Sequence, residues 1–139
     1  MKRKWKLILS LLLLGTSGVL FATLWPERQQ AGTFVNVEDK LADDAGNFTR
    51  ELLELARKND RKNFAARCHD LKNRDLPRQF ATLRKVKLAD SPDWRVQKLD
   101  QRDDLYMVLV ETRSGDAFRC ALTRNPQKSE WKFAGLCDE

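Results

Sequence analysis

Two neighbouring residues of this chain carry the side chains of a catalytic pair. Cys68 is followed directly by His69, the only histidine in the sequence, and a thiol beside an imidazole can act as nucleophile and base. The spacing argues against this role, because adjacent side chains on a helix point about 100° apart. Cys68 also falls on the apolar stripe of its expected helix. We therefore expect a structural cysteine beside an exposed histidine.

The other groups that could bind a metal or transfer a proton are scattered. One histidine and three cysteines offer no paired ligand spacing, and glycine-rich phosphate loops are missing from the sequence. Carboxylates stand together at Asp43-Asp44 and Asp103-Asp104, the second pair close to Tyr106. A tether end and a loop between strands are expected there, so solvated turn residues are predicted. The sequence thus indicates no enzyme, no metal site and no cofactor.

The three cysteines are Cys68, Cys120 and Cys137. In an oxidising compartment this number predicts one disulfide bond and one free thiol. Three pairings are open. Cys120 and Cys137 are expected to lie diagonally across a strand pair, so that joining them requires a bulge, whereas Cys68 would join a helix to the sheet.

The compartment is predicted by residues 7–25, a run of nineteen residues without charge. As a helix this run would be roughly 28 Å long, close to the hydrocarbon thickness of a bilayer. Trp5 and Trp25 bracket it, as membrane-interface anchors do. The cations that precede it are Lys2, Arg3, Lys4 and Lys6. This charge bias predicts a cytoplasmic amino terminus, with the rest of the chain outside.

We therefore predict three parts: a cytoplasmic basic tail and transmembrane signal-anchor over residues 1–25, a tether over 26–43, and an extracytoplasmic α+β domain over 44–139. The predicted location is the inner membrane, with a single pass and a periplasmic domain. A cleaved signal peptide is the alternative. Its small-residue cluster, residues 15–18, lies inside the apolar run, and cleavage there would leave an apolar new terminus.

The net charge of +6 is unevenly distributed along the chain. Four of the 26 cationic residues precede the apolar run, which leaves 22 against 20 carboxylates. Residues 50–87 hold 12 basic and 5 acidic residues, so this middle third is basic by seven charges. A candidate partner surface within it comprises Arg61, Arg67 and Arg78. A solvated helix face explains the same charges. Because Phe64 and Phe80 fall on apolar stripes, no nucleic-acid partner is expected.

Helical periodicity dominates the first half of the predicted domain. Asn47 can cap a first helix, and Asp60 a second one that carries Phe64 and Cys68 on one face. A third helix is expected after Asp75, with Pro77 in its first turn. After residue 92 the period becomes two, which indicates strands. The predicted fold class is α+β, with one N-terminal transmembrane helix and then short helices packed on a curved antiparallel β-sheet.

The strand register can be predicted from the turns. A two-residue turn at Ser114-Gly115 places Leu109 opposite Cys120 and Met107 opposite Leu122. The shared apolar face is then expected to contain Met107, Leu109, Phe118, Cys120 and Leu122. A four-residue turn over 126–129 places Phe133 opposite Leu122, with a possible bulge near Gly135.

The order of three amphipathic helices and a strand meander that ends in Glu130-Trp131-Lys132-Phe133 resembles the cone-shaped α+β domain of the nuclear transport factor two-like superfamily. The similarity covers roughly residues 44–137. It implies a short cytoplasmic tail, one membrane helix and one periplasmic domain. This is the arrangement of its membrane-anchored bacterial members, such as the assembly-factor component of type IV secretion systems.

These patterns predict a domain that acts by binding, as an accessory or assembly subunit of an envelope complex of the secretion or conjugation kind. The expected partners are the lipid bilayer and envelope proteins. Two alternatives are a domain that holds a small apolar ligand among its many aromatic side chains, and a cleaved, secreted inhibitor or immunity-type protein.

Overall fold

The computed structural model describes residues 33–70, 72 and 74–137. The predicted membrane segment 7–25, with Trp5 and Trp25, lies outside these residues. The described helices and strands, in chain order, are β1 (Phe34–Asn36), α2 (Asp39–Arg57), α3 (Arg61–Ala66), α4 (Leu76–Leu83), β2 (Arg95–Leu99), β3 (Leu105–Glu111), β4 (Ala117–Asn125) and β5 (Glu130–Leu136).

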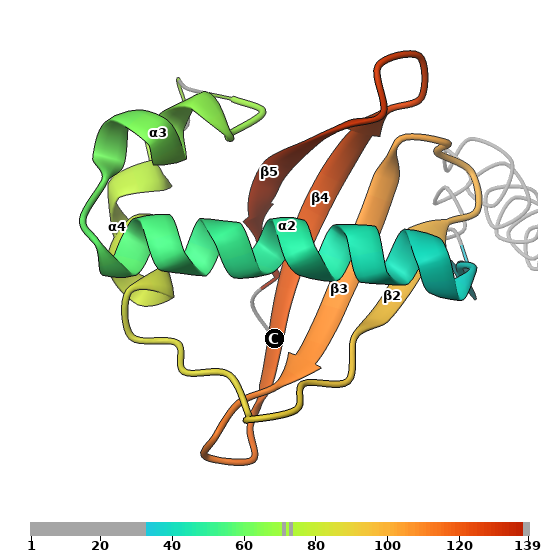
Figure 1. The fold of residues 1–139 in the computed structure, drawn as a ribbon. Helices are drawn as coiled ribbons and strands as arrows, with labels where there is room; N and C mark the ends of the chain where they lie inside the picture. Colours follow the sequence, from blue (N-terminus) through green and yellow to red (C-terminus); the bar gives the residue numbers. More distant parts are fainter. Residues whose placement is uncertain (1–32, 71, 73, 138–139) are drawn as a thin grey trace, which may run out of the picture. The chain divides into compact units, whose positions relative to one another are not determined.

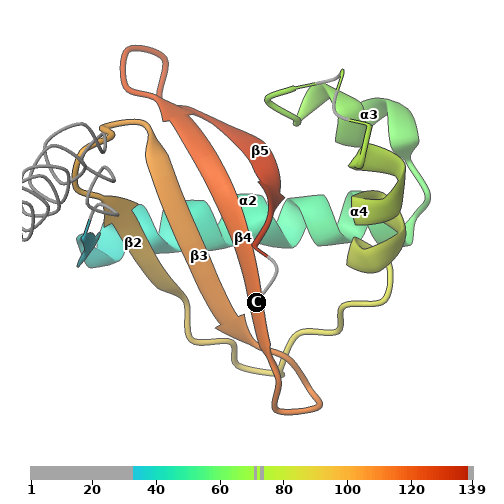
Figure 2. The ribbon, with the colours of Figure 1, turned by 180° about the vertical axis from the view of Figure 1, so that it is seen from behind.

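The five described strands form one antiparallel sheet in the order β1-β2-β3-β4-β5. Helix α2 crosses one face of this sheet, and α3 and α4 lie beside β5 at the end of α2 (Figure 1). The view from behind shows the opposite face, where the strands lie in front of α2 and no labelled helix covers them (Figure 2). We call these the covered face and the open face.

The fold class predicted from the sequence needs two corrections. It included a transmembrane helix, but none of the helices within residues 33–70, 72 and 74–137 is long and apolar enough to cross a membrane. It also expected only short helices, whereas α2 has 19 residues. For the described residues the corrected class is α+β: a five-stranded antiparallel sheet with one long and two short helices.

Helix α2 begins at Asp39, eight residues before the predicted cap at Asn47. The apolar spacing explains the earlier start, because Leu41 and Ala45 continue the stripe of Phe48 and Leu52 toward the amino terminus. Residues 34–36 and 39–43, predicted to belong to the tether, therefore form β1 and the first turn of α2.

The two short helices begin where the sequence predicted. The Asp60 carboxylate accepts a hydrogen bond from the Asn63 amide at 3.1 Å, which confirms the cap of α3. Phe64 from α3 packs edge-on against Phe80 of α4, with ring centroids 4.8 Å apart, and lies 5.9 Å from Phe133 of β5. This aromatic cluster fixes α3 and α4 against the end of the sheet.

The register predicted for the β3–β4 hairpin is wrong by one residue. Val108, not Leu109, lies opposite Cys120. The Thr112 amide donates to the Asp116 carbonyl at 2.8 Å, so the loop has three residues rather than two. Gly115 supplies the positive φ of +87° that such a loop uses.

A shift of one residue exchanges the two faces of β3. Tyr106, Val108 and Val110 are buried on the covered face, and Met107 and Leu109 point to the open face instead of the core. The partners Phe118, Cys120 and Leu122, which were predicted to be in the core, are buried.

The β4–β5 pairing follows the prediction as far as its bulge. Leu122 lies opposite Phe133, as expected for a turn over residues 126–129. Between Ala121 and Leu122 the register shifts, and Gly135, with φ of +152°, takes part in this irregularity. Cys120 consequently lies opposite Leu136.

Candidate functional site

Cys68 and His69 lie in settings that do not favour a catalytic pair. The Cys68 thiol is buried and donates to the Phe64 carbonyl, with sulfur and oxygen 3.3 Å apart. Burial raises its pKa from 9.0 to about 11, which suppresses the thiolate that a nucleophile needs. His69 is exposed, and its Nδ1 lies 3.3 Å from the Thr123 hydroxyl. The predicted helical position is wrong, because α3 ends at Ala66 and Cys68 instead forms a bridge with Phe133 of β5. That the pair has no catalytic role stays a prediction.

The backbone around these two residues protects one edge of the sheet. The His69 amide donates to the Phe133 carbonyl at 2.8 Å, and the Phe133 amide donates to the Arg67 carbonyl at 2.7 Å. Residues 67–69 thus pair with the outer edge of β5. Without them the Phe133 amide and carbonyl would lack a backbone hydrogen-bond partner.

The three cysteines are free thiols in this structure. Cys120 is fully buried, and its burial, followed by the proximity of Cys137, raises its pKa to about 12. The register brings Cys137 next to Arg119, because its amide donates to the Arg119 carbonyl at 3.3 Å. The single disulfide remains a prediction, and mass measurement of the unreduced protein tests it.

Asp103 and Asp104 lie in the loop between β2 and β3, as predicted, whereas Asp43 and Asp44 lie within α2 and not at a tether end. Asp103 is paired with Lys98 at 2.8 Å, and this hydrogen bond lowers its pKa. The Tyr106 hydroxyl donates to the Asp103 backbone carbonyl at 3.3 Å, while its ring packs against Trp131 in the core. Asp43 and Asp44 are exposed on α2. Within the described part of the chain, no three acidic, cysteine or histidine side chains are grouped to hold a metal ion.

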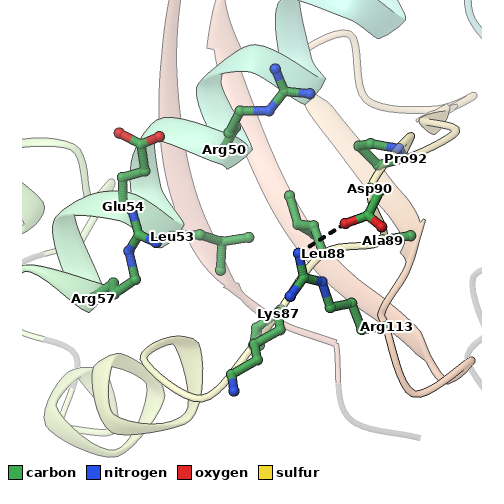
Figure 3. A pocket seen from close by; sticks show the side chains of 11 residues that line it. Arg50, Leu53, Glu54, Arg57, Lys87, Leu88, Ala89, Asp90, Pro92 and Arg113 are labelled. Carbon is green, nitrogen blue, oxygen red and sulfur yellow. Dashed lines mark hydrogen bonds and ion pairs between the residues drawn. The ribbon is translucent and has the colours of Figure 1, made fainter.

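A cleft of about 460 Å³ lies between α2 and the segment that connects α4 to β2 (Figure 3). We call it the basic cleft. Its lining comprises Arg50, Leu53, Glu54, Arg57, Val86, Lys87, Leu88, Ala89, Asp90, Pro92 and Arg113. Backbone hydrogen bonds to β3 and the loop after it hold the connecting segment in place: the Ala89 amide donates to the Glu111 carbonyl at 3.3 Å, and the Arg113 amide donates to the Lys87 carbonyl at 2.9 Å.

The basic cleft has an apolar floor and charged walls. Leu53 from α2 and Leu88 from the connecting segment point into its middle (Figure 3). Four cationic side chains line it, against two carboxylates. One of those carboxylates, Asp90, is held by Arg113 at 2.8 Å. Arg50 also lies over the Trp94 ring, 5.9 Å from its centroid. A ligand that combines carboxylates with an apolar group matches this lining.

The arginines proposed from the sequence as a partner surface do not line this cleft. Arg61 borders a smaller apolar depression of about 190 Å³ between α3 and α4, with its guanidinium carbon 5.7 Å from the Phe80 ring centroid. Arg67 is paired with Glu51 at 2.5 Å, and Arg78 is exposed on α4. Three of the cleft's cations, Arg50, Arg57 and Lys87, belong to the basic third that the sequence shows, but sequence reasoning did not single them out as a site. Only the folded connecting segment brings Lys87 and Arg113 opposite α2.

The aromatic side chains proposed to surround a small apolar ligand fill the core instead. Those that are buried are Phe48, Phe64, Phe80, Phe118, Trp131 and Phe133. Trp94 packs against Gly46, where an added Cβ would lie 2.5 Å from the ring. Two of these rings, Phe64 and Phe80, also line the apolar depression of about 190 Å³ between α3 and α4, so the ligand-binding alternative stays a prediction.

Comparisons with protein-family models, curated proteins and solved structures give no significant match to this chain. The resemblance to the nuclear transport factor two-like superfamily therefore stays a prediction from the sequence.

Proposed function

We propose that this protein is an accessory or assembly subunit of an envelope complex and that its described domain works by binding a partner protein. The basic cleft is the observation that carries this proposal. Its four cations and its Leu53–Leu88 floor suit a partner segment in which carboxylates stand beside an apolar side chain.

The chemistry of the other candidate groups supports binding rather than catalysis. Burial raises the pKa values of Cys68 and Cys120 to about 11 and about 12, so neither thiol is poised to react at neutral pH. The exposed His69 contacts a threonine rather than a nucleophile.

The uncharged segment 7–25 and the cations before it support a location at the inner membrane, with the domain on the outer side. Attachment to the membrane raises the effective concentration of neighbouring envelope proteins, so that a weak contact in the cleft suffices.

The test is cross-linking of the full-length chain in native membranes, followed by gentle detergent extraction and quantitative mass spectrometry. The variant Arg57→Glu/Lys87→Glu reverses two cations of the cleft. Its matched control, Lys62→Glu/Lys128→Glu, makes the same charge change at exposed positions outside the cleft. We expect a stoichiometric envelope partner that is lost from the cleft variant and retained by the control.

Equal recovery of partners with both variants would refute the role of the cleft. The triple variant Arg61→Glu/Arg67→Glu/Arg78→Glu tests the surface indicated by the sequence in the same experiment. The intact mass of the recovered chain also distinguishes the anchored from the secreted protein: a shortened chain that is recovered alone would favour the secreted inhibitor.

A further inference from the structure

The open face of the sheet carries more apolar side chains than a solvated face requires. Register and burial place these side chains on it together, because Phe34 pairs with Leu99 and Met107 pairs with Ala121. The apolar set, which we call the open-face stripe, comprises Phe34, Leu99, Leu105, Met107, Leu109 and Ala121. Phe34, at the border of the stripe, is 41% exposed, which is unusual for so large an apolar side chain in the described domain.

Strand β3 shows the anomaly most clearly. It reads Leu-Tyr-Met-Val-Leu-Val before Glu111, so both of its faces are apolar. Strands with one solvated face alternate between apolar and polar residues, whereas continuous apolar runs are typical of strands that are buried on both faces. Its neighbour β4 has Arg119 and Thr123 at the positions that alternate with its core residues. The excess of apolar surface therefore follows β3 along the middle of the open face.

The charges beside the stripe indicate what covers it. Arg95 from β2 and Arg119 from β4 lie directly opposite Leu109 on either side, which forms an Arg-Leu-Arg row across three strands. On this face Glu111 stands at the end of β3, and Glu130 is already paired with Lys132 at 2.9 Å. A partner with carboxylates beside an apolar stripe complements this arrangement, while a second copy of the chain would bring a like-charged row.

We propose that the open-face stripe is a docking surface for an acidic amphipathic segment of a partner protein. This surface lies on the side of the sheet opposite α2, whose side chains form a wall of the basic cleft, and it is independent of the function proposed for the cleft. Apolar contacts along β3 supply the burial, and the exposed guanidinium group of Arg95 orients the segment by its carboxylates.

The test uses the full-length chain in detergent and a fluorescent 18-residue helical peptide with leucines on one face and glutamates on the other, next to a scrambled peptide of equal composition. Fluorescence anisotropy measures the affinity. We expect saturable binding of the amphipathic peptide that weakens at least tenfold in Met107→Ser/Leu109→Ser and severalfold in Arg95→Glu. All titrations are made in the cleft variant Arg57→Glu/Lys87→Glu, so that binding of the acidic peptide by the basic cleft is weakened and the open-face stripe is measured by itself.

Circular dichroism checks that the variants are folded, and Arg95→Glu keeps the test valid if the double serine variant is not, because Arg95 is exposed. Equal affinity for the two peptides, or no loss in Arg95→Glu, would overturn the proposal. Sedimentation that shows a dimer lost in Met107→Ser/Leu109→Ser would assign the stripe to a second copy instead. Binding to phosphatidylglycerol vesicles without peptide binding would assign it to the membrane.

Discussion

The covered and open faces of the sheet are built from alternate residues of the same strands, yet they serve different purposes. On the covered face Val108, Cys120 and Leu122 are fully buried beneath the helices. On the open face Met107 and Leu109 remain partly exposed, although they are as apolar as the core residues next to them in sequence. The difference shows that burial in this fold follows the helices rather than hydrophobicity alone. Apolar side chains that the fold leaves uncovered are the ones available to a partner.

The largest contrast between protected and accessible positions is expected in thiol reactivity. Burial raises the pKa of Cys120 from 9.0 to about 12, so the thiolate fraction near pH 8 falls by about three orders of magnitude relative to the unfolded chain. Iodoacetamide labelling of the full-length chain, followed by peptide mass spectrometry, should find Cys120 modified rapidly only in guanidinium chloride. Comparable labelling rates in the folded and unfolded protein would show that the covered face is open to solvent.

A pair of truncations compares the two faces directly. Leu122→Ala removes a fully buried side chain from the covered face and should lower the free energy of unfolding by about 2–5 kcal/mol. Met107→Ala on the open face should cost less than about 1 kcal/mol, since half-exposed positions leave no sealed cavity. Urea denaturation of the two variants measures both values. Equal losses would mean that the open face is as enclosed as the core.

These two residues also show how far the sequence predicts the fold. Periodicity located both short helices and four of the strands, because apolar spacing reflects which sides are buried. Periodicity could not decide which side of β3 faces the core, because the residues at both sets of alternate positions are apolar. The decision there rests on one loop residue: Arg113 joins Ser114 and Gly115 in a three-residue loop. Local sequence does not settle that choice, because Ser-Gly suits both loop lengths.

The candidate site was less predictable than the fold. The basic third of the chain was visible in its composition, but Arg57, Lys87 and Arg113 are distant in sequence and meet only in the folded domain. The start of α2 was misplaced for a related reason. Asn47 is a good cap by residue type, but Leu41 and Ala45 pack against the core and extend the helix beyond it.

A helix substitution tests how tightly α2 is seated on the covered face. An added Cβ at Gly46 would lie 2.5 Å from the Trp94 ring, so Gly46→Ala must displace that side chain. Overpacking should cost about 1–3 kcal/mol, and the better helix propensity of alanine offsets roughly 0.5–1 kcal/mol of this. Asn47→Ala, at the exposed neighbouring position, is the matched control and should change stability little. Stabilisation by Gly46→Ala in thermal unfolding would contradict this packing.

The smallest effect is expected at the cap of α3, which carries Phe64 onto the β5 end of the covered face. The Asp60 carboxylate accepts from the Asn63 side chain at 2.6 Å, and chiefly this hydrogen bond, followed by that of the Asn63 amide, lowers the pKa of Asp60 below 3.8. A lowered folded-state pKa means that the cap stabilises the protein above about pH 4 and loses its contribution as the pH falls through that lower value.

Asp60→Ala should therefore lower the melting temperature slightly at pH 7, and its difference from wild type should shrink as the pH falls through the lowered pKa of Asp60. Circular dichroism melts of both proteins at pH 7, 4.5 and 2 measure this, with Asp93→Ala, at an exposed loop position, as control. A difference that persists at pH 2 would show that the hydrogen bonds act without the carboxylate charge. An early melting step that removes only part of the helical signal would show that α3 and α4 unfold as a unit separate from α2.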